Sequence, residues 1–303
     1  MSAGQGGARF RAPMMPRVAL LLLIAVPAAA QSRPVPAILS FPANVRAAGL
    51  AGAGVAMTGY AGSIFNNPSG LAPIRSLSVE ATLARLPDRS TYTMGSAAFR
   101  VRDFNFGGGY QYLRFPGESP VYDNLSWVGA AVYRYGGIAL GSSGKYVSVE
   151  DSAGTIVRSV TTDLGATVAF FDIAALALSV HNLGDWSVSN GGLELPRSWH
   201  LGFSFNLLDT FSNGRLLATI ETVWAQNQRR RTVVGVEAGA VFYGLGLIGR
   251  VGHGGQPGDI SGDLSKTTWG GSVVAGEARF DYAYQRRSPL GRGVHLFGVR
   301  WTP

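Results

Sequence analysis

Cysteine is absent from this chain of 303 residues, and charged residues are scarce, at 15%. Without cysteine the chain has no disulfide framework, no thiolate metal site and no lipid-modified N-terminal cysteine. Lys and Arg number 26 against 18 Asp and Glu, but the basic residues are scattered apart from Arg229, Arg230 and Arg231. No strip of alternating aromatic and basic residues accompanies them, so we expect no nucleic-acid partner.

Long apolar runs are also missing. After residue 30 no stretch reaches about 18 uninterrupted apolar residues, so we expect no membrane-spanning helix in the mature chain. The N-terminus has the features of a secretory signal: three arginines, the apolar run 18–26, and an Ala-Ala-Ala triplet that fits a cleavage site before Gln31. The sequence therefore predicts a signal peptide at 1–30 and an exported mature protein.

What the chain has in abundance is a two-residue period from Leu77 onward. In PRSWHLGFSFNL, for example, large apolar residues occupy every second position, which puts them on one face of a strand. We count fourteen such segments: 76–86, 91–102, 103–115, 122–135, 136–149, 158–170, 172–182, 196–207, 215–225, 231–242, 243–252, 267–276, 278–287 and 293–302. Most have the length of a tilted strand that crosses a bilayer.

The length of each connection depends on whether the segment before it is odd- or even-numbered. Even-numbered segments are mostly followed by tight turns, with 208–214 as the exception. Odd-numbered segments are mostly followed by longer polar stretches: PGESPVYD, the DSAGTIVR region, GDWSVSNGGLE, QNQRRR and HGGQPGDISGDLSK. Short periplasmic turns alternating with long extracellular loops are typical of outer-membrane barrels, whereas a soluble β-sandwich has no reason to sort its loops. The sequence predicts an all-β transmembrane antiparallel barrel at 76–303 with both termini on the periplasmic side.

Residues 31–75 depart from this pattern. They are small, Gly-rich and apolar, and are then interrupted by a turn made of Asn66, Asn67, Pro68, Ser69 and Gly70. A barrel of this size has an interior that must be filled or form a channel. We therefore expect 31–75 to be a hatch inside the lumen, held by this turn, whose Asn side chains hydrogen-bond to backbone groups.

Several charged residues fall on the polar faces of the expected strands. The candidate lumen charges are Glu80, Glu221, Glu237, Arg250, Asp281 and Arg300. Reflecting the strands across their turns puts Glu221 opposite Glu237, Glu237 beside Arg250, and Asp281 near Arg300. These charges either form a structural ladder that fixes register and anchors the hatch, or line a path that guides a solute.

No motif indicates catalysis, a cofactor or a metal. GLGLIG at 244–249 lies within a strand instead of opening a helix, and GSSGKY at 141–146 has Tyr where a magnesium-binding hydroxyl is required. The four histidines show no metal-ligand spacing. Glu221 and Glu237 could form an acid–base pair, but nothing else supports catalysis. We expect no enzyme activity, no cofactor and no metal.

Residues 49–72, GLAGAGVAMTGYAGSIFNNPSGLA, resemble the Gly-rich lead and N-P-A-G-L-A motif that open the FadL-type outer-membrane transporters and their PorV/PorQ relatives of the type IX secretion system, with Ser69 where the family usually has Ala. TTDLGATVAF, LALSVHNLG, ELPRSWHLGFSF and FDYAYQRRSPLGRGVHLFGVRW are closer to the PorV/PorQ branch. The resemblance covers essentially the whole mature chain and implies a fourteen-stranded barrel with an N-terminal hatch. The loops are shorter than those of FadL-type fatty-acid transporters.

Two functions follow from the resemblance. The motif order favours an accessory of protein secretion or surface attachment, with secretion-machinery proteins as partners. The alternative is a FadL-like passive transporter of a hydrophobic solute. Both imply the outer membrane of a Gram-negative-type bacterium and contact with its lipid. An apolar path beside the hatch would favour transport, and a sealed lumen would favour the platform.

Overall fold

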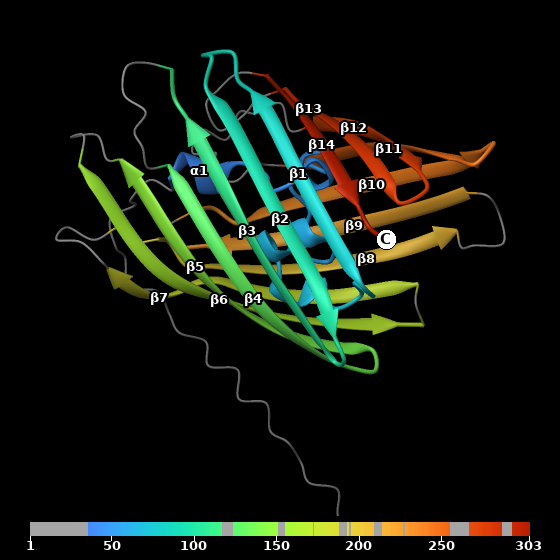
Figure 1. Cartoon of the computed structure of the whole chain (residues 1–303), viewed down its shortest axis with the longest axis horizontal. Coiled ribbons are helices and arrows are strands. Elements are labelled where there is room, and N and C mark those ends of the chain that lie inside the picture. The colour runs from blue at the N-terminus through green and yellow to red at the C-terminus, as the bar shows by residue number, and fades with distance from the viewer. Residues whose placement is uncertain are drawn as a thin grey trace, which may run out of the picture. The chain divides into compact units, whose positions relative to one another are not determined.

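The computed structural model describes residues 36–116, 124–150, 155–171, 173–187, 193, 195–208, 214–226, 228–254, 267–286 and 293–303. The signal peptide expected at 1–30, the first five residues of the expected hatch, and much of the expected long loops lie outside the described residues. Figure 1 shows the strands arranged around a common interior.

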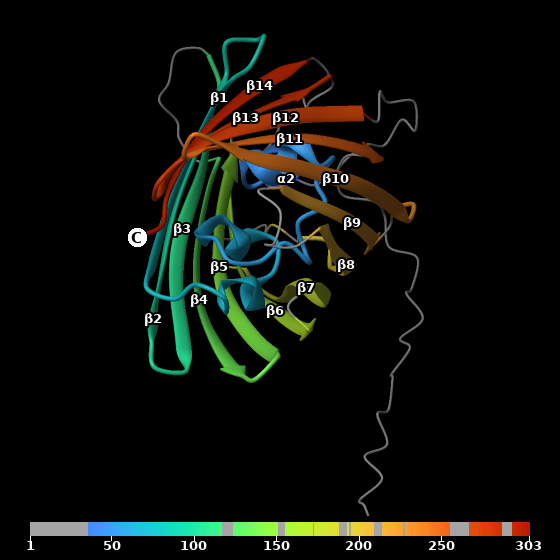
Figure 2. The same ribbon diagram turned by 90° about the vertical axis from the view of Figure 1, so that its right-hand side faces the viewer.

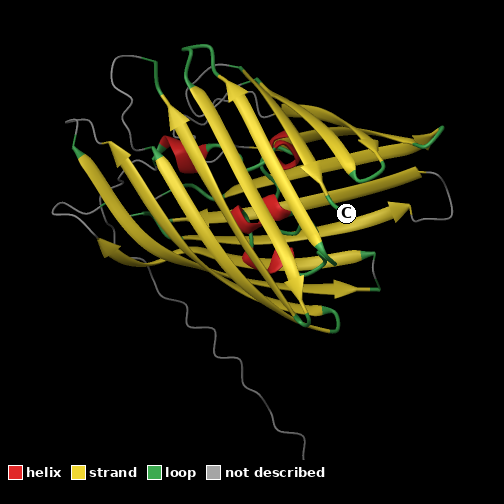
Figure 3. Ribbon diagram, in the orientation of Figure 1, coloured by secondary structure: helices red, strands yellow, loops and turns green. Residues whose placement is uncertain are grey.

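The fold is a closed antiparallel barrel of fourteen strands, as the sequence predicted (Figure 3). The strands are β1 Leu77–Arg85, β2 Thr91–Val101, β3 Phe104–Arg114, β4 Leu125–Tyr135, β5 Ile138–Glu150, β6 Ile156–Phe170, β7 Ala174–Ser187, β8 Ser198–Leu208, β9 Gly214–Ala225, β10 Arg231–Phe242, β11 Leu245–Gly254, β12 Thr267–Ala275, β13 Ala278–Gln285 and β14 Val294–Trp301. Each strand pairs with its chain neighbours, and β14 closes the barrel on β1 from Val79↔Trp301 to Arg85↔His295. Closure leaves no unpaired sheet edge.

Four hairpins at one end of the barrel have two-residue turns, at 102–103, 136–137, 243–244 and 276–277. Arg102, Gly136, Tyr243 and Gly276 adopt positive φ there, as tight hairpin turns require. We call this end the short-turn end and the other the long-loop end. In outer-membrane barrels short turns face the periplasm and long loops face outward.

The outer face of the barrel is apolar. In β8, Trp199, Leu201 and Phe203 are 46%, 40% and 40% exposed, while Gly202 and Ser204 between and beyond them are buried. The same alternation repeats around the barrel, so large apolar side chains face outward on every side. An apolar surface of this extent is typical of a protein surrounded by lipid.

Residues 36–76, which we call the luminal segment, precede β1 and lie inside the barrel (Figure 2). They form the short helices α1 Ala37–Ser40 and α2 Val45–Gly49 and the 3₁₀ turns η1 Ala61–Phe65 and η2 Pro68–Leu71. Among the residues that the structure describes, no helix is long and apolar enough to cross a membrane.

Strand glycines let the wall approach the luminal segment closely. A Cβ on Gly252 of β11 would collide with the backbone of Leu50 and Ala51, and one on Gly141 of β5 would lie 2.6 Å from the Ser69 nitrogen. Only residues without a side chain fit at these two positions.

Strand β7 is longer than the sequence predicted. The expected segment ended at residue 182, with GDWSVSNGGLE as the loop that follows it. Instead β7 continues to Ser187, with positive φ at Asn182 and Gly184 and register shifts against β6 between Val160 and Leu164. An irregularity of this type absorbs the turn-like residues without ending the strand.

Candidate functional site

The turn predicted to hold the hatch is centred on Asn67, which is fully buried. Its Oδ1 accepts hydrogen bonds from the backbone N–H of Ser69 at 3.0 Å and from the Ser69 hydroxyl at 2.7 Å. Its Nδ2 donates to the Val55 carbonyl at 3.0 Å and to the Thr167 hydroxyl of β6 at 3.2 Å. One side chain therefore closes the turn and joins the luminal segment to the wall.

The neighbouring Asn66 has a different role. Its amide nitrogen has no hydrogen-bond partner among the described residues, while its backbone carbonyl lies 2.9 Å from Nε2 of His181. Pro68 starts η2, and Gly70 is buried within it. Of the two asparagine side chains, only that of Asn67 caps the turn.

A first group of buried polar side chains lies on β5, β6 and β7. Nζ of Lys145 is 3.0 Å from Oδ2 of Asp163, and Nδ1 of His181 is 3.4 Å from the same oxygen. Because His181 also contacts the Asn66 carbonyl, this group connects the wall to the turn of the luminal segment. Lys145 and His181 were not among the sequence candidates, although their inward positions in the alternation could have indicated them.

Glu221 on β9 holds the luminal segment at a second point. Its Oε2 accepts hydrogen bonds from the backbone N–H groups of Gly54 at 2.7 Å and Val55 at 2.9 Å. Its Oε1 lies 2.8 Å from Nδ1 of His200, whose ring centre is 4.5 Å from that of His181. A buried carboxylate that accepts two backbone N–H groups fixes the local chain direction.

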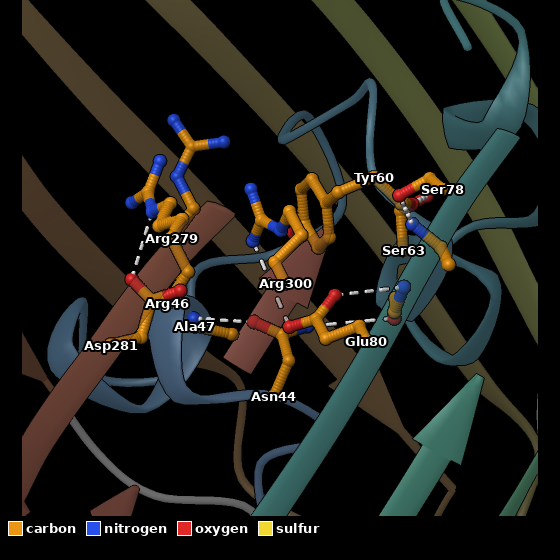
Figure 4. Close-up of polar contacts among 12 residues, drawn as sticks. Asn44, Arg46, Ala47, Tyr60, Ser63, Ser78, Glu80, Arg279, Asp281 and Arg300 are labelled. Carbon is orange, nitrogen blue, oxygen red and sulfur yellow. Dashed lines mark hydrogen bonds and ion pairs between the residues drawn. The ribbon is translucent and has the colours of Figure 1, made fainter. Parts of the chain in front are cut away.

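A second group, the arginine cluster, occupies the middle and the short-turn half of the lumen. It consists of Arg46, Arg215, Arg250, Arg279 and Arg300 with the carboxylates of Glu80, Glu237 and Asp281. Figure 4 shows part of it, where α2 meets β1, β13 and β14.

Glu237 is the centre of this cluster. Arg46 of α2 donates to both of its oxygens at 2.9 Å, and Nε of Arg250 donates to Oε2 at 2.7 Å. Burial opposes the charged form of Arg46, but the adjacent Glu237 offsets this effect and raises the pKa of Arg46. The bidentate, charge-assisted pair Arg46–Glu237 joins the luminal segment to the wall at two points.

The other two carboxylates bind different partners. Oδ1 of Asp281 accepts from Nε of Arg279 at 2.9 Å and lies 3.2 Å from Nη2 of Arg250. Oε2 of Glu80 accepts from the backbone N–H of Gly62 at 3.0 Å. Each of the three carboxylates thus meets either an arginine of the wall or the luminal segment.

Tyr60 lies between two arginines of the cluster. Its ring centre is 5.6 Å from the guanidinium carbon of Arg46 and 4.5 Å from that of Arg300, which is a cation–π arrangement (Figure 4). Burial raises the pKa of Tyr60 to about 12, so the phenol stays neutral at physiological pH.

Of the three charge relations expected from the sequence, one is wrong. Glu237 does pair with Arg250 across β10 and β11. Glu221, however, lies opposite Val233, and the residue opposite Glu237 on β9 is Leu217.

Asp281 lies opposite Gly298, two residues from Arg300 on β14, as expected. Its ion pairs, however, are with Arg250 and Arg279. Arg300 lies opposite Glu80 in the β1–β14 seam. Reflection across turns could not show this pairing, because β1 and β14 are neighbours only in the closed barrel.

The long-loop half of the lumen contains a large apolar region, beside buried polar side chains such as Gln111 and Gln285. We call this region the apolar chamber; its buried inward-facing side chains are Ala84, Leu86, Tyr92, Met94, Leu113, Val147, Val149, Val157, Val294 and Leu296. Ile38 and Phe41, within and just after α1, fill it, and the ring of Phe41 stacks on Tyr92 at 5.0 Å. The lumen therefore has an apolar region toward the long loops and a charged region toward the short turns.

Two hollows adjoin the lumen wall. A cavity of about 230 Å³ at the short-turn end is lined by Arg46, Met57, Pro73, Arg215 and neighbouring wall residues. A hollow of about 580 Å³ lies over Gly249 and Gly271 on β11 and β12, between outward-facing apolar side chains.

Among the described residues, no group of three or more His, Asp or Glu side chains is placed to hold a metal ion. The buried polar side chains instead form hydrogen bonds and ion pairs that hold the luminal segment inside the barrel.

No protein-family model and no curated protein matches the chain. Solved structures do. The CymD monoaromatic hydrocarbon channel superposes with a TM-score of 0.56 at 12% identity, over 86% of this chain and 97% of that one. The Ralstonia pickettii toluene transporter TbuX gives 0.54 at 12% identity, over 86% and 98%. A FadL homologue of Pseudomonas aeruginosa gives 0.53 at 13% identity, over 86% and 98%. The chain shares the fold of FadL-type channels.

Proposed function

We propose that the protein is a passive transporter of hydrophobic small molecules in the outer membrane, of the FadL type. The observation that carries this proposal is the apolar chamber. The interior of a water-conducting barrel is polar, whereas here a large part of the lumen that faces the long loops is lined by residues such as Met94, Leu113 and Leu296. A lining of this kind favours a solute that leaves water readily.

The luminal segment supplies the gate. α1 has four residues and no side-chain hydrogen bond at its N-cap, so apolar contacts of Ile38 and Phe41 mainly hold it in the chamber. A hydrophobic solute can replace those contacts with its own, whereas a polar solute cannot. The charged half below keeps the rest of the segment attached to the wall while α1 moves.

Two further observations support this function. The hollow over Gly249 and Gly271 is an apolar groove on the outer face of the wall, where a hydrophobic solute meets lipid. The proteins that share the fold include a toluene transporter and a monoaromatic hydrocarbon channel. Small hydrocarbons are therefore the solute class to test.

The test is the initial rate of uptake of radiolabelled toluene by intact cells of a strain without a hydrocarbon channel. We expect faster uptake when the protein is present and a loss of this gain in the double variant Met94→Asn, Leu296→Asn. Ser96→Asn, which faces inward below Met94, is the matched control and should keep the gain. Equal uptake with and without the protein would overturn the proposal.

A second function is favoured by the tightness of the luminal network. Asn67 of the luminal segment bonds to the wall as well as to its own segment. In the other direction, the wall carboxylates Glu221 and Glu237 bond to groups of the luminal segment. Such a network suits a sealed barrel that serves as a platform. This is the secretion accessory that the PorV/PorQ resemblance implied. Reproducible co-purification with secretion-machinery proteins from outer membranes, together with no toluene uptake, would favour it over transport.

A further inference from the structure

An apolar groove crosses the outer face of the barrel on β11–β14. It is the hollow of about 580 Å³ over Gly249 of β11 and Gly271 of β12, which pair with each other and have no side chain to fill it. Larger side chains border these glycines: Leu247, Val273, Phe280, Tyr282 and Phe297. The wall therefore offers the bilayer an open recess in which an apolar chain finds contacts on several sides.

A row of polar and aromatic side chains lies beyond the groove, nearer the long loops. Strand pairing puts one residue from each of the neighbouring strands β12, β13, β14, β1, β2 and β3 at one level, and we call these residues the rim row: Trp269, Tyr284, His295, Arg85, Thr91 and Arg114. Tyr282, which lines the groove, precedes Tyr284 by two residues, or about 7 Å along the strand. Its hydroxyl lies 2.9 Å from Nδ1 of His295. The groove and the rim row therefore adjoin.

The aromatic part of the rim row indicates its depth in the bilayer. Tyr284 lies between Trp269 and His295, with ring centres 5.4 Å and 4.9 Å away. Trp and Tyr rings concentrate where the hydrocarbon of a bilayer meets the lipid head groups. Arg85 and Arg114, at the same level of the barrel, therefore lie at the depth of the head groups, and the groove lies at the depth of the acyl chains.

Arg85 and Arg114 bring positive charge to this surface. Both are exposed, and each is the last residue of its strand. Within the part of the chain that the structure describes, neither guanidinium has a carboxylate partner. Asp88, the acidic residue nearest to Arg85 along the chain, instead accepts hydrogen bonds from the backbone N–H and the hydroxyl of Ser90. Arginines placed in this way attract anionic head groups, and a guanidinium matches two oxygens of a phosphate.

We propose that this surface binds one lipid whose head group carries an anionic phosphate, in the leaflet on the long-loop side. The phosphate bonds to Arg85, with Arg114 and His295 on the neighbouring strands, and an acyl chain lies in the groove over Gly249 and Gly271. Charge and apolar contact act together, as lasting attachment of a lipid requires. The site is compatible with transport of a hydrophobic solute and with the platform function, and it depends on neither.

The test is native mass spectrometry of the purified protein in an uncharged detergent. Dioleoyl phosphatidic acid, dioleoyl phosphatidylcholine and sodium phosphate are added separately and in competition. We expect one molecule of phosphatidic acid to stay bound at concentrations at which phosphatidylcholine does not, and inorganic phosphate not to displace it. Equal retention of the two lipids, or displacement by inorganic phosphate, would overturn the proposal.

Two pairs of variants test the two parts of the site. Arg85→Gln should weaken binding of phosphatidic acid about fivefold or more, whereas Arg197→Gln, at an exposed arginine next to β8 on the opposite side of the barrel, should not. Gly249→Leu fills the groove and should also weaken binding. Gly129→Leu is its control, because an added Cβ meets nothing within 4 Å at either glycine and Gly129 faces outward on β4. Equal affinities within either pair would contradict the proposed site.

Discussion

Replacing Glu237 by Gln should release the luminal segment from the wall. The carboxylate is fully buried and accepts three hydrogen bonds of 2.7–2.9 Å from Arg46 and Arg250. Gln keeps the shape and one acceptor but removes the charge, which leaves two buried guanidinium groups without their principal counter-ion. Losing one partner of a buried ion pair costs about 3–5 kcal/mol.

This cost should appear in the attachment of the luminal segment and not in the barrel ladder, because the strands keep all their backbone hydrogen bonds. Hydrogen–deuterium exchange of the luminal-segment amides is the direct assay. A loss of about 3–5 kcal/mol accelerates exchange through local opening by roughly 100- to 4,000-fold.

Glu277→Gln is the matched control for this prediction. It is the same substitution at an exposed turn, where the carboxylate accepts the indole N–H of Trp301 at 3.1 Å and no other hydrogen bond within the described part of the chain. It should change stability by less than about 0.5 kcal/mol. If luminal-segment exchange is the same in the two variants, the reasoning about Glu237 is refuted.

Three further predictions concern the segment, the lipid face and the wall. Deleting Ala37–Pro73 should leave a barrel that inserts and has a higher small-ion conductance in planar bilayers; conductance no greater than that of the parent would show that the segment does not plug the lumen. Leu201→Arg should cost about 2–4 kcal/mol in a refolding titration, whereas Tyr243→Arg at the turn should cost at most about 1 kcal/mol; equal costs would reject the assigned lipid face. Gly252→Ala should speed proteolysis of the luminal segment, because its Cβ meets backbone there, while Gly249→Ala, with nothing within 4 Å, should not; matching digestion rates would contradict this.

The barrel could be predicted from the sequence because the residue pattern within each strand is enough to show which of its faces is apolar. Leu201 and Phe203 alternate with Gly202 and Ser204 whatever lies beside them, and the turn around Gly136 needs only local conformation. Strand number, face and most boundaries follow from such short-range patterns.

The contacts across the lumen could not be predicted in this way. Arg46 and Glu237 are separated by 191 residues, and no period in the sequence relates α2 to β10. The hydrophobic lining at Met94 and Leu296 was also missed, because an inward apolar residue is indistinguishable by pattern from an outward one until the register is known.

Pairing of the luminal segment with both ends of the chain has a mechanical consequence. α2 packs on β11–β14, the last four strands in the chain, while η1 and η2 pack on β1–β6, the first six. The β1–β14 seam is therefore spanned from inside by a covalent strap. Separating β14 from β1 requires breaking the backbone hydrogen bonds between these two strands. It also requires breaking the ion pair between Arg46 of α2 and Glu237 of β10. A barrel that lacks the luminal segment should unfold at a lower pulling force, and the first strand pair to separate should be β1–β14.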